Sequence, residues 1–322
     1  MMMFLRKIAL SALCLAASFT AHSGGDDSAT RTVQDVYGTA IEIPTTPKRV
    51  ITLSEIDLDS ALALGITPVG TVNGRGQQTL PRYLQPAIEQ DIQIVGDLNR
   101  PNMETILELE PDLILTTPNR PEVLALLNEI APTVVTFKRG EPWKATFDRT
   151  AKILNRQQQA TDFMAKYQQV VQQSKAQISN KIGQTISVVR WNPKGPAYMF
   201  KDSFASQIIA DIGMTRPSYQ QDPGHTHSLS LSLEALGVLD GNWMVIGTLS
   251  TTGEAVDAMK QAESTPAFKQ LSAIQAKRYD AVDGSLWTSV GGPLAALQVM
   301  QDIVELVNKP DAEPLSQASA QK

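Results

Sequence analysis

Apolar side chains recur at helical spacing in the middle of the chain, within a stretch from residue 143 to residue 182 that contains neither glycine nor proline. Steps of three, four, seven and eight residues place them on one stripe, while the other faces carry Gln, Lys and Ser. The stripe comprises Phe163, Tyr167, Val170, Val171, Ile178 and Ile182. The pattern predicts a helix over residues 157–181, a rod of about 35 Å at 1.5 Å per residue. A rod that is mostly exposed to water indicates a connector between two domains, with a long surface helix of a single domain as the alternative.

Short β-branched runs alternate with helical runs on both sides of this rod. Strands are predicted at 49–54, 69–72, 113–116 and 133–137 before it, and at 185–190, 197–200, 243–246 and 281–282 after it. Helices are predicted at 55–64, 103–109 and 122–130, and later at 203–212, 233–239, 254–261, 266–271 and 293–307. A small hairpin over 33–43 precedes them. The alternation implies two α/β lobes with mainly parallel sheets, an N-terminal lobe over 24–142 and a C-terminal lobe over 183–310, with a connecting helical region over 143–182.

The N-terminus has the pattern of a secretory signal peptide. Arg6 and Lys7 precede an uncharged apolar run that is too short to span a membrane, and small residues follow it. We expect residues 1–23 to be removed by cleavage after Ser23. Cys14 is the single cysteine, and it lies inside the apolar run behind Leu13, where a lipid-anchored start would have a small residue. The sequence therefore predicts a periplasmic protein without a lipid anchor, and a mature chain without disulfides.

Charge argues against two classes of partner. The chain has 28 Lys and Arg against 33 Asp and Glu, a net charge of −5, and removal of the two cations in residues 1–23 leaves 26 against 33, or −7. An acidic protein is a poor match for nucleic acid or for an anionic membrane surface. We expect no membrane-spanning segment after the signal peptide. The polar residues 311–322 are expected to form a disordered tail.

The two halves of the chain share one feature. Asn102 precedes a predicted helix with Glu104 in its first turn, and Ser232 precedes another with Glu234 in the same place. Each glutamate lies nine residues before the start of the next predicted strand. The helix macrodipole alone is a sufficient explanation for one acid in a first turn. Matching acids in matching places suggest paired, outward-pointing carboxylates that dock one symmetric basic partner.

A resemblance to one family rests on five stretches of the chain, residues 47–70, 101–115, 203–214, 227–247 and 282–304. In order and spacing they resemble the periplasmic substrate-binding proteins of ABC importers for ferric siderophores, which are related to ferrichrome-, ferric-citrate-, cobalamin- and haem-binding proteins. The resemblance implies two Rossmann-like lobes joined by one long rigid helix, the class III architecture of these proteins, with a small hinge-like closure on ligand. It also implies that each lobe offers a glutamate, here Glu104 and Glu234, to arginines of the permease. The expected partners of the monomer are a ferric siderophore and an inner-membrane ABC permease dimer with its ATPase.

Ligands of open α/β sheets bind beyond the carboxyl ends of the strands, so both lobes are expected to present loops to one cleft. The candidate ligand-binding residues there are arginines and aromatic residues: Arg75, Arg120 and Arg139 in the N-terminal lobe, and Arg190, Trp191, Tyr198, Tyr219 and Trp287 in the C-terminal lobe. Guanidinium groups neutralise the oxygens of an anionic iron chelate, and rings pack on its organic frame. A solvated surface charge is the competing explanation for each arginine taken alone. The pattern favours a ferric siderophore as ligand, with the iron carried by the chelator and no intrinsic cofactor.

Two histidines remain after removal of the signal peptide, His225 and His227, and both lie in the loop before the Glu234 helix. A His-x-His loop can place an imidazole on iron when a siderophore leaves coordination sites open. The resemblance implies the same use, together with a tyrosine, in relatives that bind tetradentate catecholates. An ordinary polar loop is the alternative. Zinc is not expected, because related zinc importers use histidines from both lobes and the mature N-terminal lobe has none.

No enzyme motif accompanies these features: the sequence has no Gly-x-Ser-x-Gly, no His-Glu-x-x-His and no cysteine nucleophile in the mature chain. We therefore predict a transport binding protein and not an enzyme. Haem or a corrinoid is the alternative ligand within this class, and a secreted α/β enzyme is the alternative outside it. Arg75, Arg139 and Arg190 suit an anionic chelate better than haem, which calls for a mostly apolar slot.

Overall fold

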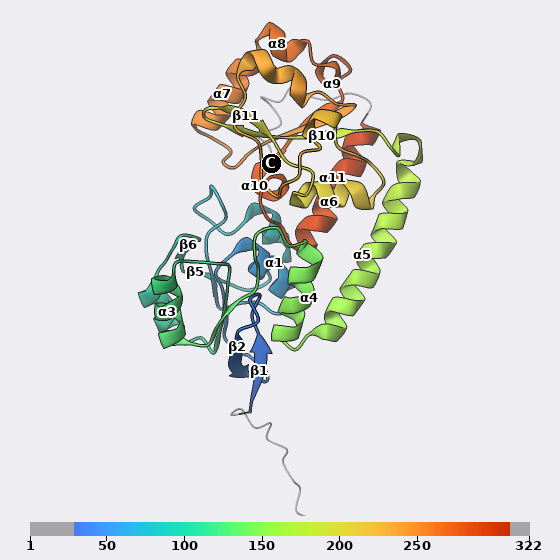
Figure 1. Cartoon of the computed structure of the whole chain (residues 1–322). Coiled ribbons are helices and arrows are strands. Elements are labelled where there is room, and N and C mark those ends of the chain that lie inside the picture. The colour runs from blue at the N-terminus through green and yellow to red at the C-terminus, as the bar shows by residue number, and fades with distance from the viewer. Residues whose placement is uncertain (1–28, 310–322) are drawn as a thin grey trace, which may run out of the picture.

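The computed structural model describes residues 29–309, which fold into two α/β lobes, one above the other in Figure 1. The predicted signal peptide and the predicted tail lie outside the described residues. An antiparallel hairpin of β1 (Thr30–Gln34) and β2 (Ala40–Pro44) begins the described chain and confirms the predicted hairpin. Within residues 29–309, no helix has both the length and the apolarity needed to cross a bilayer.

The N-terminal lobe is built on a parallel sheet of five strands. Their order is β5 (Gln93–Ile94), β4 (Gly70–Thr71), β3 (Val50–Thr52), β8 (Leu113–Thr116) and β9 (Thr133–Val135). The helices of this lobe are α1 (Glu55–Ala63), η1 (Arg82–Ala87), α2 (Met103–Glu108) and α3 (Pro121–Ile130), and a short hairpin of β6 (Gly96–Asp97) and β7 (Arg100–Pro101) precedes α2. Because β3 lies between β4 and β8, the chain winds outward from β3 in both directions. Such a switch of direction leaves a crevice at the carboxyl ends of the strands.

The C-terminal lobe has a mixed sheet of four strands. Their order is β11 (Gly195–Tyr198), β10 (Ile186–Asn192), β12 (Trp243–Thr248) and β13 (Tyr279–Asp283), and only β11 runs antiparallel to its neighbour. The helices are α6 (Phe204–Asp211), α7 (Glu254–Glu263), α8 (Pro266–Lys269), α9 (Ser272–Gln275) and α10 (Gly284–Trp287), with 3-10 turns η3 (Ser218–Gln220) and η4 (Leu233–Leu239). The two sheets confirm the predicted fold of two α/β lobes with mainly parallel strands.

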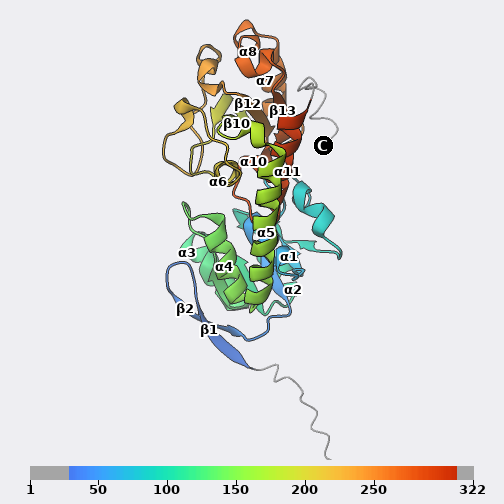
Figure 2. The same ribbon diagram turned by 90° about the vertical axis from the view of Figure 1, so that its right-hand side faces the viewer.

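Helices α4 (Trp143–Ile153) and α5 (Gln157–Gln177) connect the lobes, and Figure 2 shows α5 running along one side of the molecule from the lower lobe to the upper one. The predicted rod is confirmed, with its last turn as the 3-10 helix η2 (Ser179–Lys181). It is separate from α4 because Asn155 has a φ of 54°, a left-handed conformation that asparagine adopts more readily than most residues.

Most residues of the predicted apolar stripe face the hydrophobic core. Tyr167, Val171 and Ile178 are buried, and Phe163 and Val170 are partly buried against the same core. Ile182 is exposed, so its assignment to the stripe was wrong. It follows η2, where the chain has already left the helical path that would bring it onto the stripe.

Helix α11 (Pro293–Asn308) makes a second connection between the lobes, packing against α1 and α4 below and against α6 above. Its N-terminus is held by the fully buried Asp59 of α1, whose carboxylate accepts the backbone N–H groups of Gly292, Leu294 and Ala295 at 3.2, 2.7 and 2.9 Å. A carboxylate in this position satisfies N–H groups that have no partner within the helix.

One hydrophobic core extends through both lobes. It runs from the inner face of the lower sheet through α4, α5 and α11 to the upper sheet, and Val50, Tyr167, Val188 and Ile303 belong to it. Separate clusters lie on the outer faces of the two sheets. Because well-packed cores deform little, the shared core limits how far the lobes move relative to each other.

Candidate functional site

The carboxyl ends of both sheets meet at the seam between the lobes, and the structure brings Arg75 and Arg190 together there. Arg75 follows β4, and Arg190 lies near the carboxyl end of β10. Burial, and then the nearby charge of Arg75, lower the pKa of Arg190 to about 10. The two predicted arginines, one from each lobe, are therefore electrostatic neighbours across the seam.

The Arg190 side chain is in an unusual position for a cation. The residue is only 4% exposed, and its Nε has no hydrogen-bond partner. Residues 29–309 contain no carboxylate within ion-pair distance of its guanidinium. A buried charge is ordinarily paired, because removing it from water is costly. This arrangement suits a site that receives an anion.

The Arg75 loop is held by Glu55, the first residue of α1. One carboxylate oxygen of Glu55 accepts the backbone N–H of Arg75 at 2.8 Å. Burial raises the pKa of Glu55 to about 7, and the negative charge of Asp283 adds to this, while the charges of Arg75 and Arg82 lower it. Glu55 was not among the site residues predicted from the sequence, although it directly follows a buried strand, where ligand-facing residues are expected.

Two glycine contacts bring the loops of the two lobes together. Gly76 approaches Leu249 so closely that a Cβ on Gly76 would lie 2.9 Å from the Cβ of Leu249, and the Gly76 carbonyl accepts the hydroxyl of Ser250 at 2.9 Å. Elsewhere along the seam, a Cβ on Gly140 would lie 2.9 Å from Nε2 of His225. Both glycines have positive φ, so another side chain there would add strain as well as bulk.

An ion pair between Arg82 and Asp283 also joins the lobes, and Arg82 donates a further hydrogen bond to the Leu249 carbonyl at 3.2 Å. Asp283 is additionally the N-cap of α10, accepting the backbone N–H of Ser285 at 2.8 Å. Neither charged residue was selected from the sequence. An Asp-Gly-Ser sequence directly after a strand was the available signal for Asp283, whereas Arg82 has none.

The two histidines have different environments. His225 is exposed, rests against Gly140 of the other lobe, and has Nδ1 3.3 Å from the Asp202 carbonyl. His227 is half-buried, with Nδ1 2.7 Å from the carbonyl oxygen of its neighbour Ser228. Within residues 29–309, no three His, Cys, Asp or Glu side chains gather as a metal site. An iron contact from either imidazole therefore stays a prediction that depends on a chelator to supply the other ligands.

The two tryptophans in the predicted site require a correction, because their rings are buried in the cores. Trp191 lies within β10, which extends to Asn192, and its ring packs on Phe268 of α8 at 6.3 Å between ring centres. Trp287 is fully buried in α10 and donates its indole N–H to Asp302 at 2.8 Å. A ring in either position offers no face to a ligand at the seam in this structure.

The two tyrosines lie in or beside the loop that carries the histidines. Tyr198 donates its hydroxyl to Asp222 at 2.9 Å and packs edge-on against Phe200. Burial, and then the hydrogen bond to Asp222, raise the pKa of Tyr198. Tyr219 is exposed. The structure gives neither ring a contact with the arginines of the seam.

The other two predicted arginines are exposed. Arg139 directly precedes Gly140, the residue that touches His225, so its backbone lies at the seam. Arg120 is the N-cap residue of α3, beyond the carboxyl end of β8. Within residues 29–309, neither side chain hydrogen-bonds to the C-terminal lobe, so their role in ligand binding stays a prediction.

The predicted docking acids are exposed at the starts of their helices. Asn102 caps α2 as predicted, accepting the backbone N–H of Glu104 at 3.1 Å. The matching element in the other lobe, η4, is a 3-10 helix and not the predicted α-helix, and the Ser232 side chain makes no cap hydrogen bond to its backbone. Ser232 instead hydrogen-bonds to Glu234 and lowers the pKa of this carboxyl. The nine-residue spacing is confirmed, because β8 begins at Leu113 and β12 begins at Trp243.

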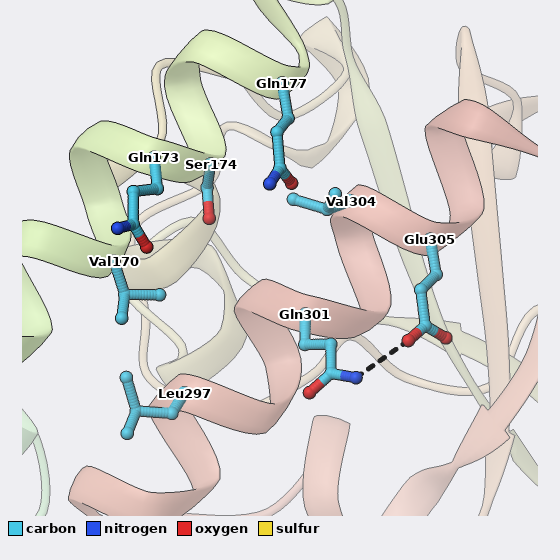
Figure 3. Close-up of a pocket in the computed structure, with 8 residues that line it drawn as sticks. All are labelled: Val170, Gln173, Ser174, Gln177, Leu297, Gln301, Val304 and Glu305. Carbon is cyan, nitrogen blue, oxygen red and sulfur yellow. Dashed lines mark hydrogen bonds between the residues drawn. The ribbon is translucent and has the colours of Figure 1, made fainter.

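A groove of about 450 Å³ lies between α5 and α11, and Figure 3 shows the side chains that line it. Amide side chains from both helices line it, together with the Glu305 carboxylate, which accepts a hydrogen bond from Gln301 at 2.8 Å. The groove contains none of the arginines expected to bind the ligand, so we do not assign it to the candidate site.

Comparisons with known proteins agree with this architecture. Residues 50–281 match the model of a family described as periplasmic binding protein. The chain is 30% identical over 309 residues to a probable siderophore-binding lipoprotein, YfiY, of Bacillus subtilis, covering 93% of this chain and 94% of that protein. It is 28% identical to an achromobactin-binding periplasmic protein of Dickeya dadantii, covering 81% and 86%. The crystal structure of Staphylococcus aureus SirA complexed with staphyloferrin B superposes with a TM-score of 0.74 at 25% identity, covering 87% of this chain and 99% of that one.

Proposed function

The chain belongs to the periplasmic binding protein family, and on this basis we propose that it captures a ferric siderophore between its lobes and delivers it to an ABC permease for iron uptake. Members of this family bind substrates for transport. The protein acts in this way without catalysis and without an intrinsic cofactor, because the iron arrives inside the chelator.

Arg190 is the observation that carries the proposal. Its guanidinium is buried and has no acid partner, although arginine presents a planar set of donors that matches carboxylate and other oxyanions. An anionic chelate at the seam supplies the missing acceptors. Arg75 contributes from the opposite lobe, so one ligand relieves the repulsion between the two cations and contacts both lobes.

The two other arginines extend the positive surface on which the chelate binds. Arg139 and Arg120 follow β9 and β8, and both are exposed. His225 lies beside Arg139 through its contact with Gly140, so its imidazole is available to a chelate that leaves an iron coordination site open. Tyr198 and Tyr219 pack on parts of the ligand that extend toward the histidine loop.

The loaded protein then docks on the permease dimer through Glu104 and Glu234, one acid from each lobe. Both carboxylates are exposed on short helical elements that occupy matching places in the two lobes. Basic side chains on two permease subunits complement them. The protein acts as a monomer, because its two lobes already provide the pair of acids.

The mature protein begins after Ser23 and is free in the periplasm. The position of Cys14 inside the apolar run supports this, while YfiY is a lipoprotein. N-terminal sequencing of the exported protein and labelling of cells with radioactive palmitate test the assignment. A palmitate-labelled mature protein would contradict it.

A ligand screen tests the proposed function. Purified protein is titrated with ferric citrate, a ferric hydroxamate, a ferric catecholate and haemin, with quenching of tryptophan fluorescence as the readout. We expect micromolar or tighter binding of at least one anionic ferric chelate and none of the iron-free form at the same concentration. Binding of haemin alone would favour the haem alternative, and binding of none of the four would contradict the proposal.

A further inference from the structure

The exposed apolar side chains are not scattered evenly over the molecule. Of the nine large apolar side chains that are exposed within residues 29–309, six fall into two groups, each on or next to the element that carries one of the docking acids. The N-lobe group is Leu98, Leu107 and Leu126, and the C-lobe group is Tyr219, Leu229 and Leu233. Exposed leucines of this kind mark interaction surfaces when they gather near one another.

The N-lobe group lies on the helix that carries Glu104 and on the two elements next to that helix. Leu107 is three residues after Glu104 in α2, so the two side chains lie on the same exposed face of that helix. Leu98 lies in the turn between β6 and β7, which leads directly into α2, and Leu126 lies on α3, which packs against α2.

The leucines of the C-lobe group lie along the segment that leads into Glu234. Leu233 directly precedes Glu234, and Leu229 lies four residues further upstream with most of its side chain in water. The polar residues between these leucines are serines. The acid in each lobe therefore has an apolar neighbour, although the leucines occupy different positions relative to the two acids.

We propose that the permease binds these apolar groups together with the two acids, receiving Leu107 and Leu229 in apolar recesses next to its basic side chains. This proposal rests on the docking role proposed above for Glu104 and Glu234. An acid with apolar neighbours is partly shielded from water when it docks, so its ion pair is stronger than one on a bare polar surface.

Charge decides between a permease and a lipid surface as the occupant. A bilayer surface could also take up exposed leucines, but bacterial membranes contain anionic lipids and attract basic segments. Here each group lies beside a carboxylate, Glu104 or Glu234, and the chain as a whole has a net charge of −5. A protein partner with basic side chains fits both features.

The different placement of the leucines has a consequence for orientation. The two acids occupy matching positions, so alone they allow the protein to bind the permease dimer in either of two orientations. Leu107 follows its acid within a helix, whereas Leu229 and Leu233 precede theirs. The leucines therefore distinguish the two lobes, and a permease built from two different subunits can use them to select one orientation.

The test uses a matched pair of double variants in the full-length protein, each removing one exposed apolar side chain before α5 and one after it. Leu107→Ser/Leu229→Ser removes side chains that are 60% and 89% exposed and belong to the groups. Tyr37→Ser/Ile182→Ser removes side chains that are 63% and 50% exposed and lie outside them. Cells lacking the native gene express each variant at equal level, and uptake of radioactive iron is measured with ferric citrate and with a ferric chelate that supports wild-type growth. The dissociation constant of each purified variant is measured for the same chelates.

We expect the Leu107/Leu229 variant to take up iron about ten-fold more slowly than the wild type, with an unchanged dissociation constant for the chelate, because truncation of central interface side chains costs several-fold each. The Tyr37/Ile182 variant should transport like the wild type. Equal uptake by both variants, or equal loss in both, would overturn the proposal while leaving the proposed function intact. A wild-type protein that neither binds a ferric chelate nor restores uptake would instead contradict the proposed function itself. Retention of the wild type on permease-free vesicles of phosphatidylethanolamine and phosphatidylglycerol, lost in the Leu107/Leu229 variant, would assign the leucines to lipid and also overturn the proposal.

Discussion

Arg82 in the N-terminal lobe and Asp283 in the C-terminal lobe form a two-pronged ion pair across the seam, with Nη2 2.7 Å from Oδ1 and Nε 3.0 Å from Oδ2. The two side chains are mostly shielded from solvent, in contrast to the surface pair of Arg100 and Asp97. Two parallel hydrogen bonds between an arginine and a carboxylate fix geometry as well as contributing energy. The pair is therefore one of the contacts that set the relative position of the lobes.

Replacement of Arg82 by methionine should lower the free energy of unfolding by about 1–3 kcal/mol, because it leaves the Asp283 carboxylate partly buried without its partner. Arg100→Met is the matched control, and it should change the free energy by less than about 0.5 kcal/mol because its ion pair is exposed. Urea denaturation of the two variants measures both values. Equal effects would mean that the interlobe pair contributes no more than a surface contact.

Arg190→Met should separate ligand binding from stability. Removing a buried cation without a partner should stabilise the ligand-free protein by about 1–2 kcal/mol, since the cost of burying the charge disappears. The same change should weaken binding of the ferric chelate ten-fold or more, because charge-assisted hydrogen bonds are lost. Thermal unfolding and fluorescence titration give the two readouts. A less stable variant with unchanged affinity would remove Arg190 from the ligand site.

The two buried aspartates of helix α1 should give the protein an unusual pH dependence of stability. Burial raises the pKa of Asp57 to about 6 and that of Asp59 to about 7, against hydrogen bonds that lower both. In the unfolded chain both acids titrate near pH 4, so between about pH 4 and pH 7 the folded state binds more protons than the unfolded state. The contribution of these groups to stability is therefore present at acidic pH and is lost as the pH rises through the folded pKa values.

Urea denaturation at pH 5 and at pH 7.5 checks this prediction, and the protein should be more stable at pH 5. Asp57→Asn should reduce the difference, because asparagine does not titrate, whereas Asp91→Asn on the exposed surface should not change it. Greater stability of the wild type at pH 7.5 would contradict the assignment of these raised pKa values.

Reversal of both docking acids should uncouple binding from transport. The Glu104→Lys/Glu234→Lys variant should bind the ferric chelate with unchanged affinity and lose iron uptake. Both carboxylates are exposed, so we expect the fold to tolerate the change. Glu89→Lys/Glu254→Lys is the matched control, with one exposed acid changed in each lobe. Normal uptake by the Glu104/Glu234 variant would remove these acids from the docking surface.

Gly140→Ala should displace the imidazole of His225, because the new Cβ would lie 2.9 Å from its Nε2. Gly183→Ala is the control, because Gly183 also has a positive φ but a Cβ there would meet nothing within 4 Å. Fluorescence titration should show a lower affinity for the ferric chelate only for Gly140→Ala. Equal affinity of the two variants would mean that the position of His225 does not matter to the ligand.

The sequence predicted best those features that depend on local pattern. The rod appeared because its apolar stripe repeats within one uninterrupted segment, and the paired acids appeared because helix starts have local signals. The turn at Asn155 was missed, since asparagine is also acceptable inside a helix and only its φ of 54° reveals the break.

The candidate site was predicted less well, because its contacts join distant parts of the chain. The partners Arg82 and Asp283 are 201 residues apart, and no local pattern connects them. Trp191 was assigned to a loop, but β10 continues through it, and its ring faces Phe268, a residue that the sequence places 77 positions later. The helices that cover one face of a strand end come much later in the sequence. Sequence spacing alone therefore could not distinguish an aromatic ring in the core from one that binds ligand.

The core that passes through α4, α5 and α11 makes the two lobes one cooperative unit. Val50 and Val188 belong to different sheets, yet each contributes to the same apolar interior, so neither half could keep that interior dry after separation from the other. The molecule should consequently melt in a single calorimetric transition, and a chain cut at the rod should not yield two independently folded halves.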